Sequence, residues 1–257
     1  MSVTLTMLQQ MKASRRKIVG VVVYDYQMAQ IADRAGVDLV SAGDSVGVTL
    51  WGHASETEVT LDQMILVCRA VRHGVSRAVV SCDVPLASLA EGAGAAAAAA
   101  TRLIREGGAD LVKVDVLASA AGLVGDLARA GIPVWAQFGA ATESDAVAVD
   151  RLVHQAQQLE AAGATLLDFR HSGPVAGPAV VSAVTIPVLG GLGGGPWLDG
   201  RVRSIAAAIG YLASAVDDPT DRYANVGAAA LTAITALCDD VRAGRALKGG
   251  AAAAPKS

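Results

Sequence analysis

The sequence has few aromatic residues, few cysteines and no long uninterrupted apolar segment. Aromatic side chains make up 4% of the residues while Ala and Gly abound, which favours closely packed helices over a core of large rings. The three cysteines have neither CxxC spacing nor clustered histidines, which argues against a zinc site or a disulfide framework and favours a reducing cytoplasm. No apolar segment reaches the roughly 18 residues that a membrane span needs, so we expect no membrane segment.

Positive charge is not concentrated in any part of the sequence. The net charge is −3 and the Lys and Arg residues form no cluster, which argues against the concentrated cationic face that nucleic-acid binding requires. Residues 1–17 lack the apolar segment of a signal peptide and predict a short helix that ends in basic residues. Residues 247–257 are of low complexity and predict a disordered tail. We therefore expect a cytoplasmic protein with a single domain over residues 1–246.

One pattern recurs along the chain. A helical segment ends in a small residue and a glycine, and a short, almost entirely apolar segment follows. The glycines that can take the left-handed conformation at these helix ends are Gly36, Gly108, Gly131 and Gly163. The apolar segments after them are typical of strands that are covered on both faces, as in a parallel sheet flanked by helices.

Further apolar segments complete a set of strands that alternate with helices. Residues 17–24, 77–83 and 186–191 predict three more strands, and a weakly marked eighth falls within residues 201–210. Strands and helices that alternate over about 250 residues favour a closed (β/α)8 TIM barrel over a doubly wound sheet. The helical periodicity of residues 226–243 predicts a C-terminal helical extension, in addition to the N-terminal helix.

Three acidic residues follow consecutive strands of this predicted barrel. Asp44 follows the second strand, Asp83 the third and Asp115 the fourth, and the C-terminal strand ends carry the active site in such barrels. Three carboxylates at one rim would repel one another unless a cation lies among them, and oxygen ligands suit Mg²⁺. Helix capping is the structural alternative for a single Asp, but three on consecutive strands favour a metal site.

Two further polar residues belong to the same predicted rim. Lys113 lies two residues before Asp115, so both side chains should point into the barrel. A buried Lys needs an anion, which is either these carboxylates or a bound acidic substrate; a purely structural ion pair is the alternative. Ser45 follows Asp44 on a glycine-flanked turn and could donate hydroxyl and amide hydrogens to a carboxylate. Cys82 is expected to face the surrounding helices.

Two motifs are specific, GDSVG at residues 43–47 and TLDQM at residues 60–64. Together with further segments over nearly the whole chain, they resemble the ketopantoate hydroxymethyltransferase family, within the PEP mutase/isocitrate lyase superfamily. It implies transfer of a one-carbon unit from methylenetetrahydrofolate to the enolate of an α-keto acid, 3-methyl-2-oxobutanoate in the family reaction of pantothenate biosynthesis. It also implies a Mg²⁺ ion chelated by the keto acid, and assembly into a large homo-oligomer, often a decamer.

The resemblance assigns roles to individual residues of this chain. Asp44 and Asp83 would hold the metal directly or through water, and Asp115 would occupy the position of a third acid, a Glu in the family. Ser45 would contact the substrate carboxylate and Lys113 the substrate oxygen. The complete set expected at the substrate is Ser45, Asp83, Lys113 and Gln137.

Two departures from the family pattern bear on catalysis. The family's general base, a Glu at the end of strand six, is Arg170 here, and a family His at the end of strand five is Gln137. Arg cannot abstract a proton, because its guanidinium stays protonated in proteins. Asp168, two residues earlier, or His171 could serve as the base instead.

Arg170 also admits two interpretations in which no residue replaces the base. It could bind a second carboxylate of a different substrate, in which case the chain would be a C–C lyase or transferase acting on a dicarboxylic or modified keto acid. Alternatively, the chain is a non-catalytic relative that keeps the ligand pocket and lacks the base. Across all of these alternatives, the residues expected to act in catalysis are Arg170 and Asp168.

Overall fold

The computed structural model describes residues 2–117, 122–139, 146–191 and 194–249. The chain divides into two compact units, Met1–Ser204 and Ile205–Ser257. The strands of the sheet lie in the first unit. The single domain over residues 1–246 stays a prediction, and the predicted tail lies outside the described residues from residue 250 onward.

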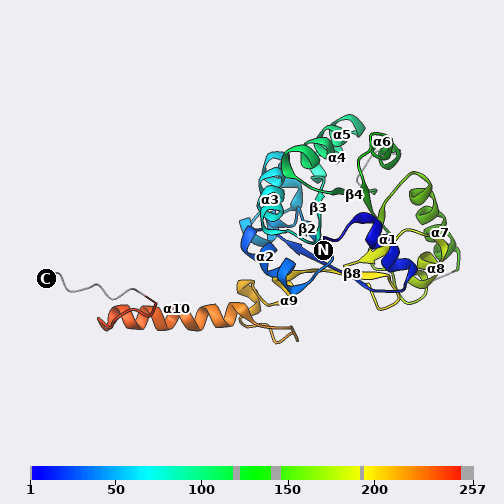
Figure 1. Ribbon diagram of the computed structural model, residues 1–257. Helices are drawn as coiled ribbons and strands as arrows, with labels where there is room; N and C mark the ends of the chain where they lie inside the picture. Colours follow the sequence, from blue (N-terminus) through cyan, green and yellow to red (C-terminus); the bar gives the residue numbers. More distant parts are fainter. Residues whose placement is uncertain (1, 118–121, 140–145, 192–193, 250–257) are drawn as a thin grey trace. The chain divides into compact units, whose positions relative to one another are not determined.

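The sheet of the first unit is a closed parallel barrel in which each strand pairs with the next and β8 pairs with β1. Figure 1 shows the strands as a central ring with the helices of this unit outside it. The strands are β1 Ile18–Val23, β2 Leu39–Ala42, β3 Val79–Asp83, β4 Leu111–Asp115, β5 Val134–Phe138, β6 Leu166–Phe169, β7 Val188–Gly190 and β8 Gly200–Ser204. The helices are α1 Leu5–Ala13, α2 Tyr26–Ala35, α3 Leu61–Gly74, α4 Leu86–Ala90, α5 Ala93–Arg102, α6 Leu123–Arg129, α7 Ala146–Ala161 and α8 Ala176–Ala183, with short helical turns η1 Gly47–Trp51, η2 Glu56–Glu58 and η3 Leu103–Gly107. The predicted (β/α)8 barrel is confirmed.

The helix ends follow from the residues that the sequence pattern singles out. The four predicted glycines all have left-handed φ values, namely Gly36 93°, Gly108 78°, Gly131 76° and Gly163 100°. Only a residue without Cβ takes this conformation readily, so each glycine ends a helix and turns the chain into the next strand. At the start of α3, the Thr60 hydroxyl accepts a hydrogen bond from the Gln63 amide, and the Gln63 side chain accepts one from the Thr60 amide.

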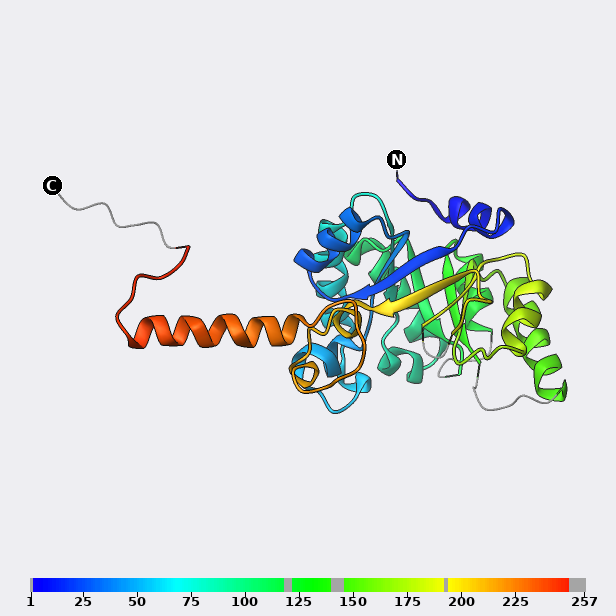
Figure 2. The ribbon, with the colours of Figure 1, turned by 90° about the horizontal axis from the view of Figure 1, so that it is seen from below.

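One end of the barrel is closed by α1. Leu8 and Met11 pack in a buried cluster with residues near the starts of the strands, among them Leu39, Leu111 and Trp135. Figure 2 shows α1 at one end of the ring of strands. Because this cluster fills the N-terminal end of the barrel, the polar inward-facing side chains lie toward the C-terminal strand ends, where such barrels carry their active sites.

The eighth strand is the one that the sequence marks least clearly. β8 begins one residue before the predicted window of residues 201–210 and ends at Ser204. Arg201 and Arg203 are exposed, whereas Val202 between them is buried. Side chains therefore alternate between the two faces of β8, in contrast to the apolar runs of the other strands.

The second unit contains the predicted C-terminal helix. This helix, α10, spans Val226–Arg242, close to the predicted residues 226–243, and the unit also contains α9 Ile205–Ala208 and the turn η4 Ala213–Ala215. The Asn225 side chain accepts a hydrogen bond from the Ala228 amide and so caps the start of α10. Over the described parts of both units, no helix combines the length and the apolar character that crossing a membrane requires.

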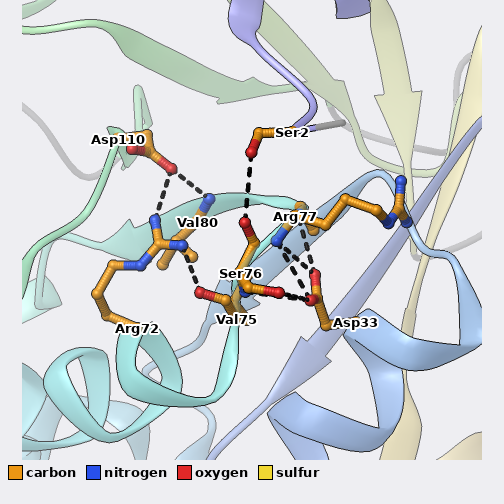
Figure 3. Close-up of polar contacts among 9 residues, drawn as sticks. Ser2, Asp33, Arg72, Val75, Ser76, Arg77, Val80 and Asp110 are labelled. Atoms are coloured by element: carbon orange, nitrogen blue, oxygen red, sulfur yellow. Dashed lines mark hydrogen bonds and ion pairs between the residues drawn. The ribbon is translucent and has the colours of Figure 1, made fainter.

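A hydrogen-bonded group ties α2 to the start of β3 (Figure 3). The buried carboxylate of Asp33 accepts hydrogen bonds from the Ser76 amide and hydroxyl, at 3.1 and 2.9 Å, and from the amides of Arg77 and Ala78, at 3.1 and 2.8 Å. Burial alone would raise the pKa of Asp33, but these hydrogen bonds outweigh it and lower the pKa below its ordinary value. The ionised carboxylate therefore holds the chain segment that leads into β3.

Three other carboxylates act in a similar way at strand starts. Asp38, Asp110 and Asp199 each precede a strand and accept the backbone N–H of the strand before it, at 3.0, 2.8 and 2.9 Å. Arg72 donates to Asp110 at 3.0 Å and holds that carboxylate from the helix side (Figure 3). These acidic residues satisfy backbone amides at the N-terminal end of the barrel and have a structural role.

Asp33→Ala is expected to lower the free energy of unfolding by about 2–4 kcal/mol near neutral pH, because it leaves several donors without their acceptor. The pKa of Asp33 is lower in the folded state, so its stabilisation is present above about pH 4 and is lost as the pH falls through the folded-state pKa. Urea unfolding from pH 3 to pH 8 measures both effects. The exposed Asp62→Ala serves as control, and a difference between wild type and Asp33→Ala that stays constant down to about pH 3 would contradict the role of the ionised carboxylate.

Candidate active site

Several polar residues predicted for the rim lie at paired positions of neighbouring strands. Asp83 of β3 pairs with Lys113 of β4, and Asp115 of β4 pairs with Gln137 of β5. Gln137 in turn pairs with Asp168 of β6. Because alternate residues of a strand face the same side, these side chains and the apolar cluster near the strand starts share the inward face of the barrel.

Asp44 and Asp83 form a pair of carboxyl groups at the ends of β2 and β3. The two groups are close enough to influence each other's protonation. Burial, followed by the charge of Asp83, raises the pKa of Asp44 from 3.8 to about 7. Burial likewise raises the pKa of Asp83, although the charge of Lys113 opposes this. Two carboxyl groups that resist ionising together favour the binding of a cation between them.

Lys113 forms a buried ion pair across the barrel interior. Its Nζ lies 3.0 Å from Asp168 Oδ2, and the two side chains are only 16% and 7% exposed. The same Nζ lies 5.1 Å from the centroid of the Trp135 ring, within range of a cation–π contact. Burial alone would lower the pKa of Lys113, but the carboxylates of Asp83 and Asp168 raise it above its ordinary value. Lys113 is therefore charged near neutral pH.

Arg170, which follows β6, lies against the ends of β4 and β5. Its Nη1 donates to Asp115 Oδ2 at 3.2 Å, and Gln137 Nε2 donates to the same oxygen at 2.9 Å. Asp115 is thus held from two sides. The Arg170 Nε atom is buried and, within the part of the chain that the structure describes, has no hydrogen-bond partner.

Ser45 lies beside Asp44 and is positioned by Tyr24. The hydroxyl groups of Tyr24 and Ser45 are 3.0 Å apart, and Thr49 lies 3.4 Å from the Tyr24 hydroxyl. A Cβ at Gly43 would lie only 2.8 Å from Val22 and 3.1 Å from Ser45 Oγ, so the turn needs a glycine there. Sequence reasoning missed Tyr24, although its position directly after the apolar residues of β1 places it at the same rim.

Two residues considered from the sequence lie elsewhere. His171, the alternative general base, is exposed and has a left-handed φ of 52°. Cys82 packs outward against α3, with its Sγ 4.0 Å from the Met64 carbonyl oxygen, as predicted. Asp168 is thus the buried member of the two alternatives for the base.

The arrangement fits a metal site with two protein carboxylates. Among the described residues, no group of three or more His, Cys, Asp or Glu side chains is placed to hold a metal ion. The predicted third ligand, Asp115, is instead held by Arg170 and Gln137, so the expected gathering of three carboxylates is not met. Mg²⁺ commonly keeps several waters and takes one or two protein carboxylates, which the Asp44–Asp83 pair can supply.

Comparison with known protein families gives one consistent match. The model of the family described as ketopantoate hydroxymethyltransferase matches residues 2–246. The 3-methyl-2-oxobutanoate hydroxymethyltransferase of Alkalilimnicola ehrlichii is 34% identical over 257 aligned positions, which cover 94% of this chain and 91% of the relative. The protein of the same name from Geobacillus kaustophilus is 32% identical over 244 positions, which cover 90% of this chain and 87% of the relative.

Solved structures with the same fold belong to more distant proteins. 2,3-Dimethylmalate lyase, a member of the PEP mutase/isocitrate lyase superfamily, has a TM-score of 0.61 and 17% identity, covering 98% of this chain and 91% of its own. Phosphonopyruvate hydrolase in complex with oxalate and Mg²⁺ has a TM-score of 0.62 and 15% identity, covering 98% and 92%. At these identities the similarity supports the fold alone.

Proposed function

Because the chain belongs to the ketopantoate hydroxymethyltransferase family, we propose that it is a transferase that adds a hydroxymethyl group to an α-keto acid. The reference substrate is 3-methyl-2-oxobutanoate, which gives ketopantoate, and the proposed one-carbon donor is methylenetetrahydrofolate. The observation that carries the proposal is the half-buried Asp44–Asp83 pair beside the charged Lys113, which pairs with Asp83 between β3 and β4, at the C-terminal end of the barrel.

In this proposal the residues of the rim hold the keto acid at both its oxygen groups. Asp44 and Asp83 would hold Mg²⁺, which when bound would polarise the keto group as a Lewis acid. Lys113 donates a hydrogen bond to the substrate oxygen that becomes negative as the enolate forms. Ser45 donates to the substrate carboxylate, and its hydroxyl is kept in place by Tyr24 at 3.0 Å.

Asp168 is the proposed general base. Lys113 holds Asp168 Oδ2 at 3.0 Å, whereas Oδ1 is buried and has no partner among the described residues. In this proposal Oδ1 accepts the C3 proton of the keto acid, since no hydrogen bond from the described residues occupies it. Loss of this proton gives the enolate, whose C3 forms the new C–C bond to the one-carbon unit. The two C–N bonds that join this unit to the donor break, and water supplies the hydroxyl group. Tetrahydrofolate leaves with two protons, one from C3 and one from water.

A keto-acid-binding protein without catalysis is the second candidate. The observation that favours it is Arg170, which stands where the resemblance places a Glu base and is engaged with Asp115. Such a protein would keep the carboxyl pair and bind the ligand but would not remove its proton. The two candidates therefore differ in whether the bound keto acid forms an enolate.

Exchange of the C3 proton separates these candidates. The full chain is incubated with 3-methyl-2-oxobutanoate and Mg²⁺ in deuterated water, and loss of the C3 proton signal is followed by NMR. We expect exchange well above the protein-free rate, and a reduction of about 10²-fold or more in Asp168→Asn, because that variant lacks the base. The control Asp126→Asn, an exposed position of α6, should exchange as wild type does. Binding of several keto acids without exchange in any of them would favour the non-catalytic candidate.

A further inference from the structure

Two ion pairs of opposite polarity connect β4 to β6. Lys113 of β4 reaches Asp168 of β6 at 3.0 Å, and Asp115 of β4 reaches Arg170, just past β6, at 3.2 Å. In both strands the charged residues are two positions apart, so the two pairs run parallel, about 6.6 Å apart along the strands. The inward face therefore carries one cation on β4 and a second, nearer the opening, at the end of β6.

The two cations differ in how completely their donors are used. Lys113 is buried and its ammonium faces the carboxylates of Asp83 and Asp168. Arg170 is 34% exposed, and its hydrogen bond to Asp115 uses Nη1 alone. Its Nε is buried and lacks a hydrogen-bond partner among the residues that the structure describes. The guanidinium therefore keeps donor capacity that the described residues do not use, and its exposed part can meet a ligand at the opening of the barrel.

The shape of the Arg170 guanidinium determines which kind of hydrogen-bond acceptor fits it. Arg presents its N–H groups as a rigid planar fork, and the fork matches the two oxygens of a carboxylate. Asp115 is itself fixed by Gln137 at 2.9 Å, so the Asp115–Arg170 contact holds the guanidinium in one orientation. Asp115 and Gln137 thus act as positioning residues for Arg170.

We propose that Arg170 binds a second carboxylate of the substrate, so that the chain acts on dicarboxylic α-keto acids in preference to branched-chain monocarboxylic ones. This inference rests on the proposed function, because it names the substrate class of the same site. The α-keto acid end of the ligand lies at Ser45 and Lys113, and the distal carboxylate lies nearer the opening of the barrel at Arg170. The residue that removes the family's base at this position thereby supplies a specificity contact.

A matched pair of ligands tests the proposal. 2-Oxoglutarate and 2-oxopentanoate have the same chain length and differ in the distal carboxylate, so their affinities for the full chain with Mg²⁺ are compared by titration calorimetry. Wild type is expected to bind 2-oxoglutarate at least tenfold more tightly, roughly the effect of one charge-assisted hydrogen bond. In Arg170→Gln this preference should fall to within about twofold while 2-oxopentanoate affinity stays unchanged, because the variant loses only the contact to the distal carboxylate.

The controls separate binding from folding. Arg203→Gln removes an exposed arginine from β8 and should keep the wild-type preference. Arg170→Lys keeps the charge but not the fork and should give an intermediate preference. Equal affinity of wild type for the two ligands, or a preference for 3-methyl-2-oxobutanoate, would overturn this inference and leave the proposed function standing. Equal weakening of both ligands in Arg170→Gln would show a structural role and overturn it too. Absence of binding by any keto acid would overturn both.

Discussion

Asp44→Asn is expected to make the Mg²⁺-free protein more stable and to abolish its stabilisation by Mg²⁺. The substitution removes a half-buried charge close to Asp83, which should raise the free energy of unfolding by about 1–3 kcal/mol near pH 8. Mg²⁺ at 100 times its dissociation constant should stabilise the wild type by about 2.7 kcal/mol and the variant not at all. Urea unfolding with and without Mg²⁺ measures both. Transfer activity should fall by about 10³-fold or more, since the metal contributes several kcal/mol to charge stabilisation.

The same carboxyl pair gives the Mg²⁺-free protein a characteristic pH dependence. The pKa of Asp44 is raised from 3.8 to about 7, so the native state keeps a proton that the unfolded state releases above about pH 4. The stabilisation from this group is fully present below about pH 4 and is lost as the pH rises through about 7. Asp44→Asn should lack this loss, and saturating Mg²⁺ should reduce it in the wild type.

Asp115→Asn is the matched control for the metal. Because Asp115 is held by Arg170 and Gln137, this variant should keep the full Mg²⁺ stabilisation. A loss of the Mg²⁺ response in Asp115→Asn equal to that in Asp44→Asn would restore the three-carboxylate site predicted from the sequence. A Mg²⁺ response that survives in Asp44→Asn would instead place the metal elsewhere.

Lys113→Met is expected to lower the free energy of unfolding by about 3–5 kcal/mol at neutral pH. The substitution leaves the buried carboxylate of Asp168 without its partner at 3.0 Å and removes the cation that opposes the raised pKa of Asp83. Thermal and urea unfolding measure the loss. The variant should also lose keto-acid turnover, because Lys113 is the proposed donor to the substrate oxygen.

A double variant distinguishes the broken pair from lost packing. Lys113→Met with Asp168→Leu removes both charges, so it should be more stable than Lys113→Met alone. Additive losses in the double variant would show that the two residues stabilise the barrel independently and would contradict the assigned ion pair.

The fold could be predicted because its signals are local and repeated. Gly36 and Gly163 end their helices in the left-handed conformation as expected, and the apolar segments after them are strands of the barrel. β8 was hard to place for a physical reason. Its exposed residues Arg201 and Arg203 interrupt the apolar run, so it has period-two alternation instead of the uniform pattern of the other strands.

The sequence predicts where the candidate site lies, but not which of its charged residues pair with one another. The sequence places Asp44, Asp83 and Asp115 after consecutive strands, yet it does not show which of them has a competing partner. Arg170 reaches Asp115 across β5, and this contact depends on the three-dimensional path of the closed barrel. The repeated spacing of opposite charges, Lys-x-Asp on β4 and Asp-x-Arg at β6, is the sequence signal that could have indicated it.

The position of an acidic residue along its strand also separates two roles. Asp38 and Asp110 precede strands and accept backbone amides at the N-terminal end of the barrel. Asp44 and Asp83 lie at the other strand ends, where burial raises their pKa values. Residue type and spacing alone do not distinguish these two groups of Asp residues. Their position at the start or at the end of a strand does.

Helix α1, near the start of the chain, limits how ligands can reach the proposed site at the opposite end of the barrel. Leu8 and Met11 of α1 fill the N-terminal end of the barrel, so ligands of the proposed site would enter and leave at the C-terminal end. Under the proposed function, the substrate that lies deeper in the barrel would therefore bind first and its product would leave last.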